Sequence, residues 1–458
     1  MLLIDSHAHI DSDDFKNDFD QVLKRAAEAE VGYIINIAID RQSILNSLKL
    51  IDQYPQIYCA LGIHPHEADK YSPEDTKLVE TLLSHPKVVA VGEVGLDFYR
   101  HYAGHNNQRR LFRTMIELAK RYSKPLVIHN RAAAENTLQI LREEGAAKLG
   151  GVFHCFPGGL DLAKQVLSLG FHISFAGPLT YPKSSLPETA DYVPMERILL
   201  ETDCPYLPPQ SWRGKRNEPA FIRETAQKLA QVKGLTLEDI ARSTSVNCHR
   251  LFSLGPAPLP TIAYPIRNSL YLNLTNRCTC DCVFCPRLKR PMVQGHNLKL
   301  EQEPSFQEVV QAVDRFSRTF EELVFCGYGE PTLRFELVKE LARHYQRRFP
   351  RIRLDTNGQG SLINRRDIVP ELMGLINAVS VSLNAASAQE YIRLNRPQYG
   401  ERAFEGMLDF MRKCLTAGLE VTASIVGFPG ADIEGTKEIA RLLGVKYRIR
   451  KYNDLGGQ

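Results

Sequence analysis

Short apolar runs and longer amphipathic stretches alternate along the first half of the chain. In residues 15–30 and 106–122, apolar side chains return every three or four positions, which is the period of an α-helix with one buried face. We interpret the apolar runs between such stretches as buried strands. Eight of these runs occur, at residues 1–4, 31–39, 57–63, 87–92, 125–128, 150–153, 171–176 and 197–201.

Alternating strands and helices on this scale predict an α/β fold, and in particular a (β/α)8 barrel of the TIM type. A doubly wound open sheet is the alternative, but the number of units and the length of the region favour the barrel. In such a barrel the loops that follow the strands surround one mouth, where catalytic residues collect. The residues directly after each predicted strand therefore matter most.

The pattern breaks after residue 252 and then resumes. Residues 253–268 are rich in proline, which disfavours helices and central strands and predicts a semi-rigid connector. We therefore expect one domain at residues 1–252 and a second at residues 269–458. In the second domain strand-like runs alternate with helical stretches six times, at residues 269–275, 322–326, 351–355, 378–383, 420–426 and 445–450.

Composition narrows the class of protein. The chain has 458 residues, 43% of them hydrophobic and 24% charged, which suits a globular protein of two or three domains. No apolar run is long enough to span a bilayer and no secretory signal is visible, so we expect no membrane contact. The net charge of +4 neither requires nor excludes a nucleic acid partner, and nothing indicates an oligomeric state.

Polar residues follow six of the eight predicted strands in the first domain. Any one of them alone would more often be a buried histidine with a backbone partner or a solvated acid. Their joint occurrence at equivalent positions instead predicts a metal site. His7 and His9 are two apart on one strand, so their imidazoles would face the same point. The candidate residues are His7, His9, His64, His66, Glu93, Asp97, His129, His154, Glu201 and Asp203.

Four histidines and two carboxylates are more ligands than one tetrahedral ion uses, which suggests a dinuclear site. A carboxylate such as Glu93 can bridge two ions about 3.5–4 Å apart, the spacing found in enzymes that hydrolyse phosphoesters. Asp203 could bind metal and also accept a proton from the attacking water. His64 could contact the substrate, although a residue that only supports the ligands would look the same.

With these residues the first domain resembles the TatD-type metal-dependent deoxyribonucleases of the amidohydrolase superfamily. The resemblance implies two divalent ions (Mg, Mn or Zn), hydrolysis of phosphodiester bonds and exonuclease action on DNA. Position by position, it implies the metal ligands His7, His9, Glu93, His129, His154 and Asp203. Family members commonly have an acidic residue where this chain has Ala132. The matching stretches are DSHAHI, GIHPHE, VGEVGLDFY, LVIHNR, GVFHCFPG, ISFAGPLTY, ETDCPYLPP and RGKRNEP.

Basic residues near the predicted mouth could hold phosphates. Arg131 follows the fifth strand, and Arg213 and Lys215 follow the eighth. We expect them to bind the backbone of DNA, with single-stranded ends as the substrate, although a bare charge run is equally compatible with a solvated surface. An amide or ester hydrolase remains the alternative, because related metal barrels cleave such bonds with the same ligand types.

The second domain opens with a cluster of cysteines. Four of the ten cysteines lie within residues 278–285, which indicates metal ligation in a reducing compartment, and we expect the cytoplasm. Structural zinc would need a second ligand pair downstream, and none follows. Cys278, Cys282 and Cys285 instead suit a [4Fe–4S] cluster with one iron open, which leaves Cys280 spare.

This spacing, with the strand–helix series behind it, resembles the radical S-adenosylmethionine (SAM) superfamily, and the whole chain resembles the TatD-linked radical SAM proteins. The resemblance implies a partial (β/α)6 barrel, SAM as cofactor, a radical reaction and an electron donor such as flavodoxin or ferredoxin. Glu330 is the implied partner of the methionyl ammonium group. A cluster-binding sensor or nucleic-acid-binding module without catalysis is the alternative. The implied cofactor contacts are Phe284, Gly327, Gly329, Glu330, Ser382 and Asn384.

Overall fold

The chain divides into two compact units, Met1–Ala257 and Pro258–Asp454. The computed structural model describes residues 2–255, 259–285, 287 and 291–452. Residue 1 of the first predicted strand and residues 256–258 of the predicted connector lie outside the described residues. No helix in the described ranges is long and apolar enough to cross a membrane.

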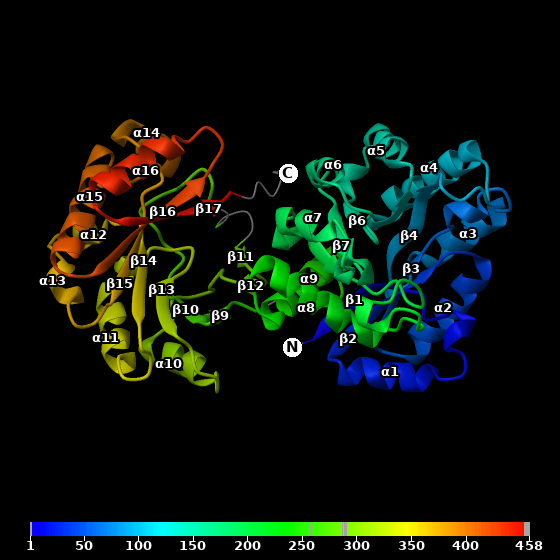
Figure 1. Ribbon diagram of the computed structural model, residues 1–458, viewed down its shortest axis with the longest axis horizontal. Helices are drawn as coiled ribbons and strands as arrows, with labels where there is room; N and C mark the ends of the chain where they lie inside the picture. Colours follow the sequence, from blue (N-terminus) through cyan, green and yellow to red (C-terminus); the bar gives the residue numbers. More distant parts are fainter. Residues whose placement is uncertain (1, 256–258, 286, 288–290, 453–458) are drawn as a thin grey trace. The chain divides into compact units, whose positions relative to one another are not determined.

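Eight parallel strands form the sheet of the first unit, and their order in the sheet follows their order in the chain (Figure 1). This arrangement confirms the predicted (β/α)8 barrel, because each predicted run contributes one strand. The strands are β1 (Leu3–Ala8), β2 (Val31–Ala38), β3 (Ile57–Leu61), β4 (Val88–Asp97), β5 (Leu126–Arg131), β6 (Gly151–Phe153), β7 (His172–Phe175) and β8 (Ile198–Leu200).

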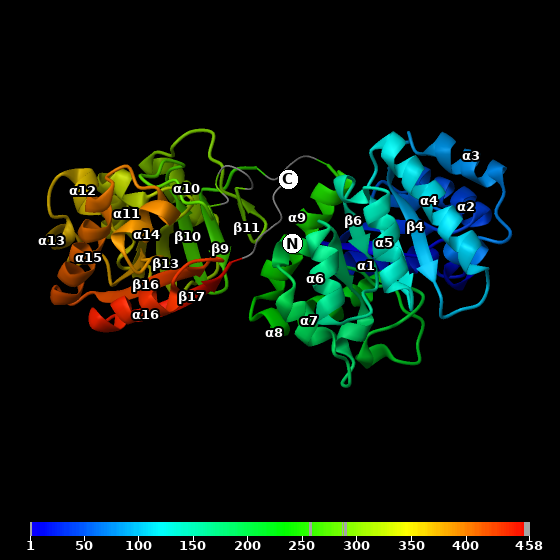
Figure 2. The same ribbon diagram turned by 90° about the horizontal axis from the view of Figure 1, so that it is seen from above.

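The helices of this unit lie outside the strands in both views (Figure 1, Figure 2). Apolar strand residues such as Ile35, Val127 and Leu199 pack with Cys248 and Phe252 of α9 and fill the barrel interior. The helices are α1 (Phe19–Glu28), α2 (Arg41–Gln53), α3 (Pro73–Leu82), α4 (His105–Tyr122), α5 (Ala134–Glu143), α6 (Leu160–Ser168), α7 (Leu186–Tyr192), α8 (Ile222–Lys233) and α9 (Leu237–Phe252).

Hydrogen bonds join β1 to the segment that follows β8. The backbone N–H of His9 donates to the carbonyl of Cys204 over 2.8 Å, and that of Asp203 donates to the carbonyl of His7 over 2.9 Å. The Ser6 hydroxyl also donates to the carbonyl of Leu200 over 2.9 Å. These contacts bring the first and last strands of the barrel together at their carboxyl ends.

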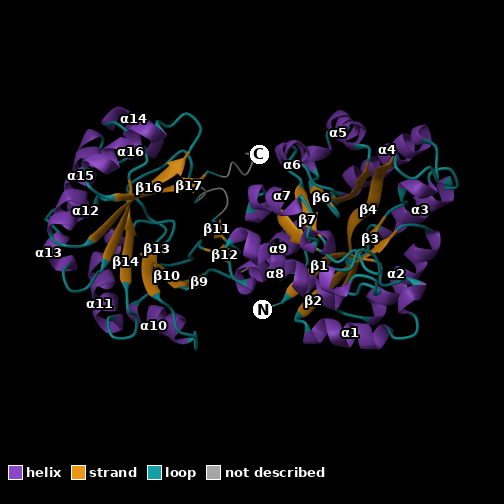
Figure 3. Ribbon diagram, in the orientation of Figure 1, coloured by secondary structure: helices purple, strands orange, loops and turns teal. Residues whose placement is uncertain are grey.

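The second unit contains a sheet with the order β17-β16-β15-β14-β13-β10-β9. Six of these strands are parallel, as the sequence predicts for a partial (β/α)6 barrel, and Figure 3 shows helices α11–α16 on one side of them. The parallel strands are β10 (Ser269–Asn273), β13 (Glu322–Cys326), β14 (Ile352–Thr356), β15 (Ala378–Ser382), β16 (Glu420–Gly427) and β17 (Lys446–Lys451).

Seven helices and a short hairpin complete the described part of this unit. The hairpin pairs β11 (Met292–Val293) with β12 (His296–Asn297). The helices are α10 (Phe306–Asp314), α11 (Phe335–Tyr345), α12 (Gly360–Asn364), α13 (Val369–Leu372), α14 (Ala388–Asn395), α15 (Glu401–Thr416) and α16 (Ile433–Leu442).

One strand lies in the stretch that the sequence predicts as a connector. Strand β9 (Ala263–Ile266) pairs with β10 in the antiparallel direction, so the second sheet begins before Ser269. Pro265 lacks an N–H donor, and β9 tolerates it because it is the edge strand. The buried side chain of Tyr264 anchors the strand to the sheet, a contact that the proline-rich pattern does not reveal.

Gly95 lets β4 lie directly against β5 beside the mouth of the barrel. Its φ of +143° is rarely adopted by other residues, and a Cβ atom there would lie 2.0 Å from the carbonyl oxygen of His129. We expect Gly95→Ala to lower the free energy of unfolding of the first unit by roughly 2–4 kcal/mol. Differential scanning calorimetry of the full chain would measure this loss.

Gly104→Ala provides the matched control. A Cβ atom at Gly104 would have no neighbour closer than 3.6 Å, and the residue has an ordinary negative φ of −63°. We expect this variant to lose less than about 1 kcal/mol. Equal midpoints for the two variants would contradict the close approach of β4 and β5.

Candidate metal centre and cysteine loop

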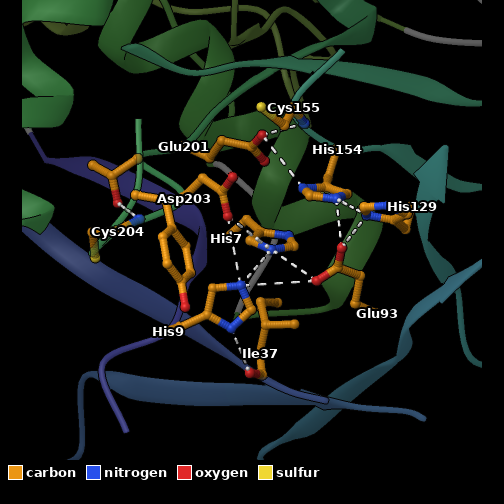
Figure 4. Close-up of polar contacts among 12 residues, drawn as sticks. His7, His9, Ile37, Glu93, His129, His154, Cys155, Glu201, Asp203 and Cys204 are labelled. Carbon is orange, nitrogen blue, oxygen red and sulfur yellow. Dashed lines mark hydrogen bonds and ion pairs between the residues drawn. The ribbon is translucent and has the colours of Figure 1, made fainter. Parts of the chain in front are cut away.

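The two histidines at the end of β1 lie against Asp203, which follows β8 (Figure 4). The Nε2 atoms of His7 and His9 are 3.3 Å apart, and each lies 3.5 Å from Oδ1 of Asp203. All three side chains are buried or nearly so. Residues separated by nearly the whole barrel therefore form one group because the first strand and the segment after the last strand are hydrogen-bonded.

The hydrogen bond of His9 fixes which of its nitrogens can bind a cation. Nδ1 of His9 lies 3.1 Å from the carbonyl oxygen of Ile37. A carbonyl only accepts, so this nitrogen carries the proton in the neutral ring and Nε2 offers its lone pair toward His7. Imidazole nitrogens and carboxylate oxygens are the donors that transition metals and zinc prefer, so these residues fit a divalent ion.

Glu93 lies between two groups of histidines (Figure 4). Its Oε2 atom is 3.5 Å from Nε2 of His7 and 3.8 Å from Nε2 of His9. Its Oε1 atom is 2.6 Å from Nδ1 of His129 and 2.7 Å from Nε2 of His154. Each carboxylate oxygen therefore faces a different pair of imidazoles, which is the arrangement that a bridging ligand requires.

The charge of Glu93 is maintained despite its burial. Burial opposes ionisation, but the nearby charge of His154 and the hydrogen bonds from His129 and His154 outweigh it, and the pKa of Glu93 lies well below its usual range. No Lys or Arg in the described part of the chain forms an ion pair with Glu93. The groups that can neutralise the charge of Glu93 are therefore the imidazoles around it. Cations bound jointly by Glu93 and these imidazoles could also neutralise it.

Asp97 orients His129 from the far side of the ring. Nε2 of His129 lies 3.1 Å from Oδ2 of Asp97, which leaves Nδ1 directed at Glu93. The same oxygen is 2.8 Å from Nε2 of His66. Asp97 stands four residues after Glu93 in β4 and therefore on the same face of the strand. That spacing could have indicated its supporting role, which the ligand pattern alone does not assign.

Two further buried acids support the site from behind. Asp5 accepts hydrogen bonds from the hydroxyl and the backbone N–H of Thr202 over 2.6 and 2.9 Å, and burial raises its pKa to about 7. Glu201 accepts the Ser174 hydroxyl over 2.7 Å, and burial raises its pKa to about 8. Asp5 is absent from the predicted site because its partner, Thr202, follows the last strand of the barrel. Only the folded barrel brings the two residues together.

His64 is placed as a donor to Glu93. Its Nδ1 atom accepts the backbone N–H of His66 over 3.2 Å, so the neutral ring carries its proton on Nε2. This Nε2 atom lies 3.4 Å from Oε1 of Glu93, and burial lowers the pKa of His64 to about 4. The geometry therefore favours a neutral His64 that holds the Glu93 carboxylate.

The three predicted phosphate-binding residues are exposed cations above aromatic rings. The guanidinium carbon of Arg131 lies 4.2 Å from the ring centre of Tyr99, and that of Arg213 lies 4.5 Å from that of Tyr181. Lys215 Nζ lies 4.8 Å from the ring of Trp212. None of the three forms an ion pair with a carboxylate among the described residues, so all three charges remain available to a ligand.

In the second unit the cysteine loop follows β10 and is pinned to the chain around the end of α14. The N–H groups of Asp281 and Val283 donate to the carbonyls of Asn395 and Leu394 over 3.0 and 2.9 Å. The N–H of Gln398 donates to the carbonyl of Thr279 over 2.8 Å. The loop is therefore held by main-chain contacts that do not depend on the cysteine side chains.

Cys280 differs in burial from the three predicted cluster ligands. Cys278, Cys282 and Cys285 are partly exposed, whereas Cys280 is buried. The sulfur of Cys280 accepts a hydrogen bond from Nε2 of Gln359 over 3.1 Å. Three thiols that remain accessible and a fourth that is engaged inside the domain fit a cluster held by three cysteines.

Gly327 and Gly329 allow the loop after β13 to pack against the chain that precedes the cysteines. A Cβ atom at Gly327 would lie 2.5 Å from Oδ1 of Asn273, and one at Gly329 would lie 2.1 Å from the carbonyl oxygen of Thr275. The two glycines thus allow two segments of the same chain to pack closely. This packing requires glycine whether or not a cofactor also contacts these residues.

Glu330 is buried beneath this loop. Its carboxylate accepts hydrogen bonds from the hydroxyls of Thr332 and Thr356 and from the N–H of Asn357, each over 2.7 Å. The N–H of Thr332 adds a fourth over 3.1 Å. Three of these donors reach Oε1, and only the N–H of Asn357 reaches Oε2. Oε2 therefore keeps an accepting position, and the contact with an ammonium group that the resemblance implies stays a prediction.

Asn384 also binds other protein groups. Its Oδ1 atom accepts the N–H of Val426 over 3.0 Å, and its Nδ2 donates to Oδ1 of Asn395 over 3.3 Å. The thiol of Cys282 lies 3.4 Å from the same oxygen of Asn395. Asn384 therefore connects the end of β16 to the cysteine loop.

The other two predicted cofactor contacts lie at the same end of the sheet. Ser382 ends β15, where it is partly exposed and pairs with Ser424 of β16. The ring of Phe284, in the cysteine loop, lies 5.7 Å from that of Phe428, which follows β16. Both side chains are thus near the strand ends, where a cofactor would have to bind.

Known proteins match each half of the chain. The family model described as TatD related DNase matches residues 4–253, and that described as Radical SAM superfamily matches residues 272–443. The uncharacterized metal-dependent hydrolase YabD of Bacillus subtilis (strain 168) is 39% identical over 255 residues, which are 56% of this chain and 100% of that protein.

Two Escherichia coli proteins are similar to the same region. The uncharacterized metal-dependent hydrolase YcfH of strain K12 is 38% identical over 267 residues, covering 57% of this chain and 100% of that protein. The crystal structure of YJJV, a TatD homolog from strain K12, superimposes with a TM-score of 0.53 at 32% identity, covering 56% of this chain and 98% of that chain. This chain therefore belongs to the TatD-related DNase family of metal-dependent hydrolases and carries a radical SAM domain C-terminal to the hydrolase barrel in the sequence.

Proposed function

We propose that the first unit hydrolyses phosphodiester bonds of DNA with two divalent ions. The observation that carries this proposal is the position of Glu93, whose two oxygens face two separate pairs of histidines. His7, His9 and Asp203 would hold one ion, His129 and His154 the other, and Glu93 both. Bound there, divalent ions would supply Lewis acidity and positive charge to a phosphodiester.

Asp203 is the residue that we assign to proton transfer. Burial opposes its ionisation, but the hydrogen bond from His9 and the charges of His7 and His154 hold the pKa of Asp203 below its usual range. Its side chain keeps 12% of its surface exposed, more than the 4% of Glu93. An ionised carboxylate that reaches the mouth can accept the proton of an attacking water.

Exposed aromatic rings near the site favour a nucleic acid substrate. Tyr206 is 58% exposed, and its ring lies 6.0 Å from that of His9. Tyr102 is 62% exposed and lies 4.8 Å from the ring of His66. Stacking surfaces combined with unpaired cations are typical of proteins that bind single-stranded DNA. A small amide or ester, the alternative substrate, would require neither.

Glu93→Gln tests the bridging role. The amide keeps the shape of the side chain but removes the charge that two ions would share, so we expect metal content to fall from about two ions per chain to one or fewer. Hydrolysis of single-stranded DNA should fall about 100-fold or more. Elemental analysis and a gel assay with Mn²⁺ would measure both.

Glu188→Gln, on the exposed surface of α7, is the control and should change neither quantity. Full metal content and activity in Glu93→Gln would exclude a bridging carboxylate. If neither the wild type nor either variant hydrolyses DNA, the nuclease proposal is excluded.

A triple variant tests the role of the exposed cations. Arg131→Gln, Arg213→Gln and Lys215→Gln together remove three charges that could contact phosphates. We expect weaker binding of single-stranded DNA and a salt dependence reduced by about 2 in the slope of log K against log[salt]. Fluorescence anisotropy at several salt concentrations would measure this.

Hydrolysis of the small phosphodiester bis(p-nitrophenyl) phosphate should stay unchanged in the same variant, since the proposal assigns the three cations to the longer backbone of DNA. An unchanged salt slope would show that the cations belong to the solvated surface. An equal loss on both substrates would place their effect at the metal centre.

For the second unit we propose a [4Fe–4S] cluster held by Cys278, Cys282 and Cys285, and reductive cleavage of SAM. The partly exposed thiols and the main-chain anchoring of their loop support this proposal. A bound cluster would supply the electron for that cleavage. The donor that delivers electrons would be a small redox protein such as flavodoxin or ferredoxin.

Two cysteine variants separate the ligands from the spare thiol. After anaerobic reconstitution, wild type should hold about four irons and form 5′-deoxyadenosine from SAM and dithionite. Cys282→Ser should lose both properties, while Cys280→Ser should keep both, since Cys280 is buried and its sulfur accepts a hydrogen bond from Gln359. Iron analysis and chromatography of the products would show this.

The opposite ranking of the two variants would overturn the ligand assignment. A complete cluster in wild type without any 5′-deoxyadenosine would instead favour the alternative of a cluster-binding sensor.

A further inference from the structure

The last strand of the second sheet places two arginines on the face that carries no described helix. In β17, Arg448 is in register with Ser424 of β16, and Arg450 with Val426. Residues in register on parallel strands share a face, and neighbours along a strand alternate. Tyr447, the residue before Arg448, faces the helices, because Arg441 of α16 lies 5.9 Å from the centre of its ring. Arg448 and Arg450 therefore point to the other side.

Polar residues of the neighbouring strands share this helix-free face. Phe325 and Leu354 belong to the core beneath the helices, so Cys326 of β13 and Arg353 and Asp355 of β14 lie opposite. We call the set Cys326, Arg353, Asp355, Ser424, Arg448 and Arg450 the inner face. A polar inner face in a partial barrel indicates that ligands are bound there.

The charges of the inner face do not balance. Arg353 has two acidic partners, with Nε 3.3 Å from Oδ1 of Asp355 and Nη2 3.3 Å from Oε2 of Glu322. Arg448 and Arg450, by contrast, form no ion pair with any described carboxylate, and both are exposed. Two guanidinium groups are therefore left without a direct carboxylate partner on this face.

The position of Arg450 connects this excess charge to the cysteine loop. Burial raises the pKa of Asp355, and the positive charges of Arg353 and Arg450 oppose that rise, which places Arg450 within electrostatic range of the middle of the sheet. Arg450 is also next to the last residue of β17. The cysteine loop leaves the same carboxyl edge of the sheet after β10, and ligands of parallel α/β sheets bind along that edge.

We propose that Arg448 and Arg450 bind a phosphate group on the substrate of the second unit, a small molecule that carries a phosphate or diphosphate. Guanidinium groups bind phosphate oxygens in pairs, and two residues along a strand are roughly 6.6 Å apart, within reach of one such group. A phosphate monoester carries about two negative charges near pH 7, which matches two arginines, whereas one carboxylate carries a single charge. This inference rests on the proposed radical function of the second unit.

Titration with inorganic pyrophosphate tests the site in the full chain with its cluster reconstituted. Isothermal calorimetry should show at least 10-fold weaker binding to the double variant Arg448→Gln/Arg450→Gln than to wild type. Arg441→Gln, on the helix side of the same edge, is the matched control and should bind like wild type. Any binding of pyrophosphate by the first unit is common to the three proteins and cancels in the comparison.

The carboxylate of SAM is the other anion that the arginines could hold, and a second measurement separates the two. In the double variant the Kd of SAM and the slow formation of 5′-deoxyadenosine without substrate should equal those of wild type. Equal pyrophosphate binding in all three proteins would overturn the proposal. Weaker SAM binding with unchanged pyrophosphate binding would also overturn it, by assigning the arginines to the cofactor.

The proposed radical function has its own readout in these experiments. A wild-type protein that forms no 5′-deoxyadenosine would refute that function, while the pyrophosphate comparison would still report whether the arginines bind phosphate.

Discussion

The candidate metal centre depends on the hydrogen bonds that close the barrel. The carbonyl of His7 accepts the N–H of Asp203, and the N–H of His9 donates to the carbonyl of Cys204. The same residues supply side chains to the centre and main-chain groups to the closure. The side chain of Asp5 adds two hydrogen bonds to Thr202 just beneath them. Geometry at the site and integrity of the barrel are therefore properties of one set of contacts.

The sequence predicts the strands of both units and the residues at their ends, because period and strand length are local properties. It also predicts that Glu93 and the histidines lie close together, since the carboxyl ends of parallel strands lie at one edge of the sheet. It does not predict how Glu93 divides its oxygens between two histidine pairs, which depends on the positions of four strands. Nor does it reveal the burial of Asp5 or the four donors around Glu330, because each partner comes from a distant element.

The two units place their chemistry at the same end of a parallel sheet but support it differently. In the first, buried acids such as Asp97 hold histidines in position. In the second, the predicted cluster ligands lie on a loop, and main-chain hydrogen bonds to residues 394–398 hold that loop in place. Strand β9, although it lies in a proline-rich stretch, extends the second sheet at its edge beside β10, which leads into the cysteine loop.

The separation of the closing residues along the chain has a consequence during synthesis. Asp5 and Thr202 are 197 positions apart, so the candidate metal centre cannot form until nearly the whole barrel has left the ribosome. Contacts of such long range close late in folding, because the entropy of the intervening loop must be overcome first. A nascent chain with only His7 and His9 exposed offers a weak pair of ligands. Under the proposed ligand assignment, all the ligands are therefore together only in the folded protein.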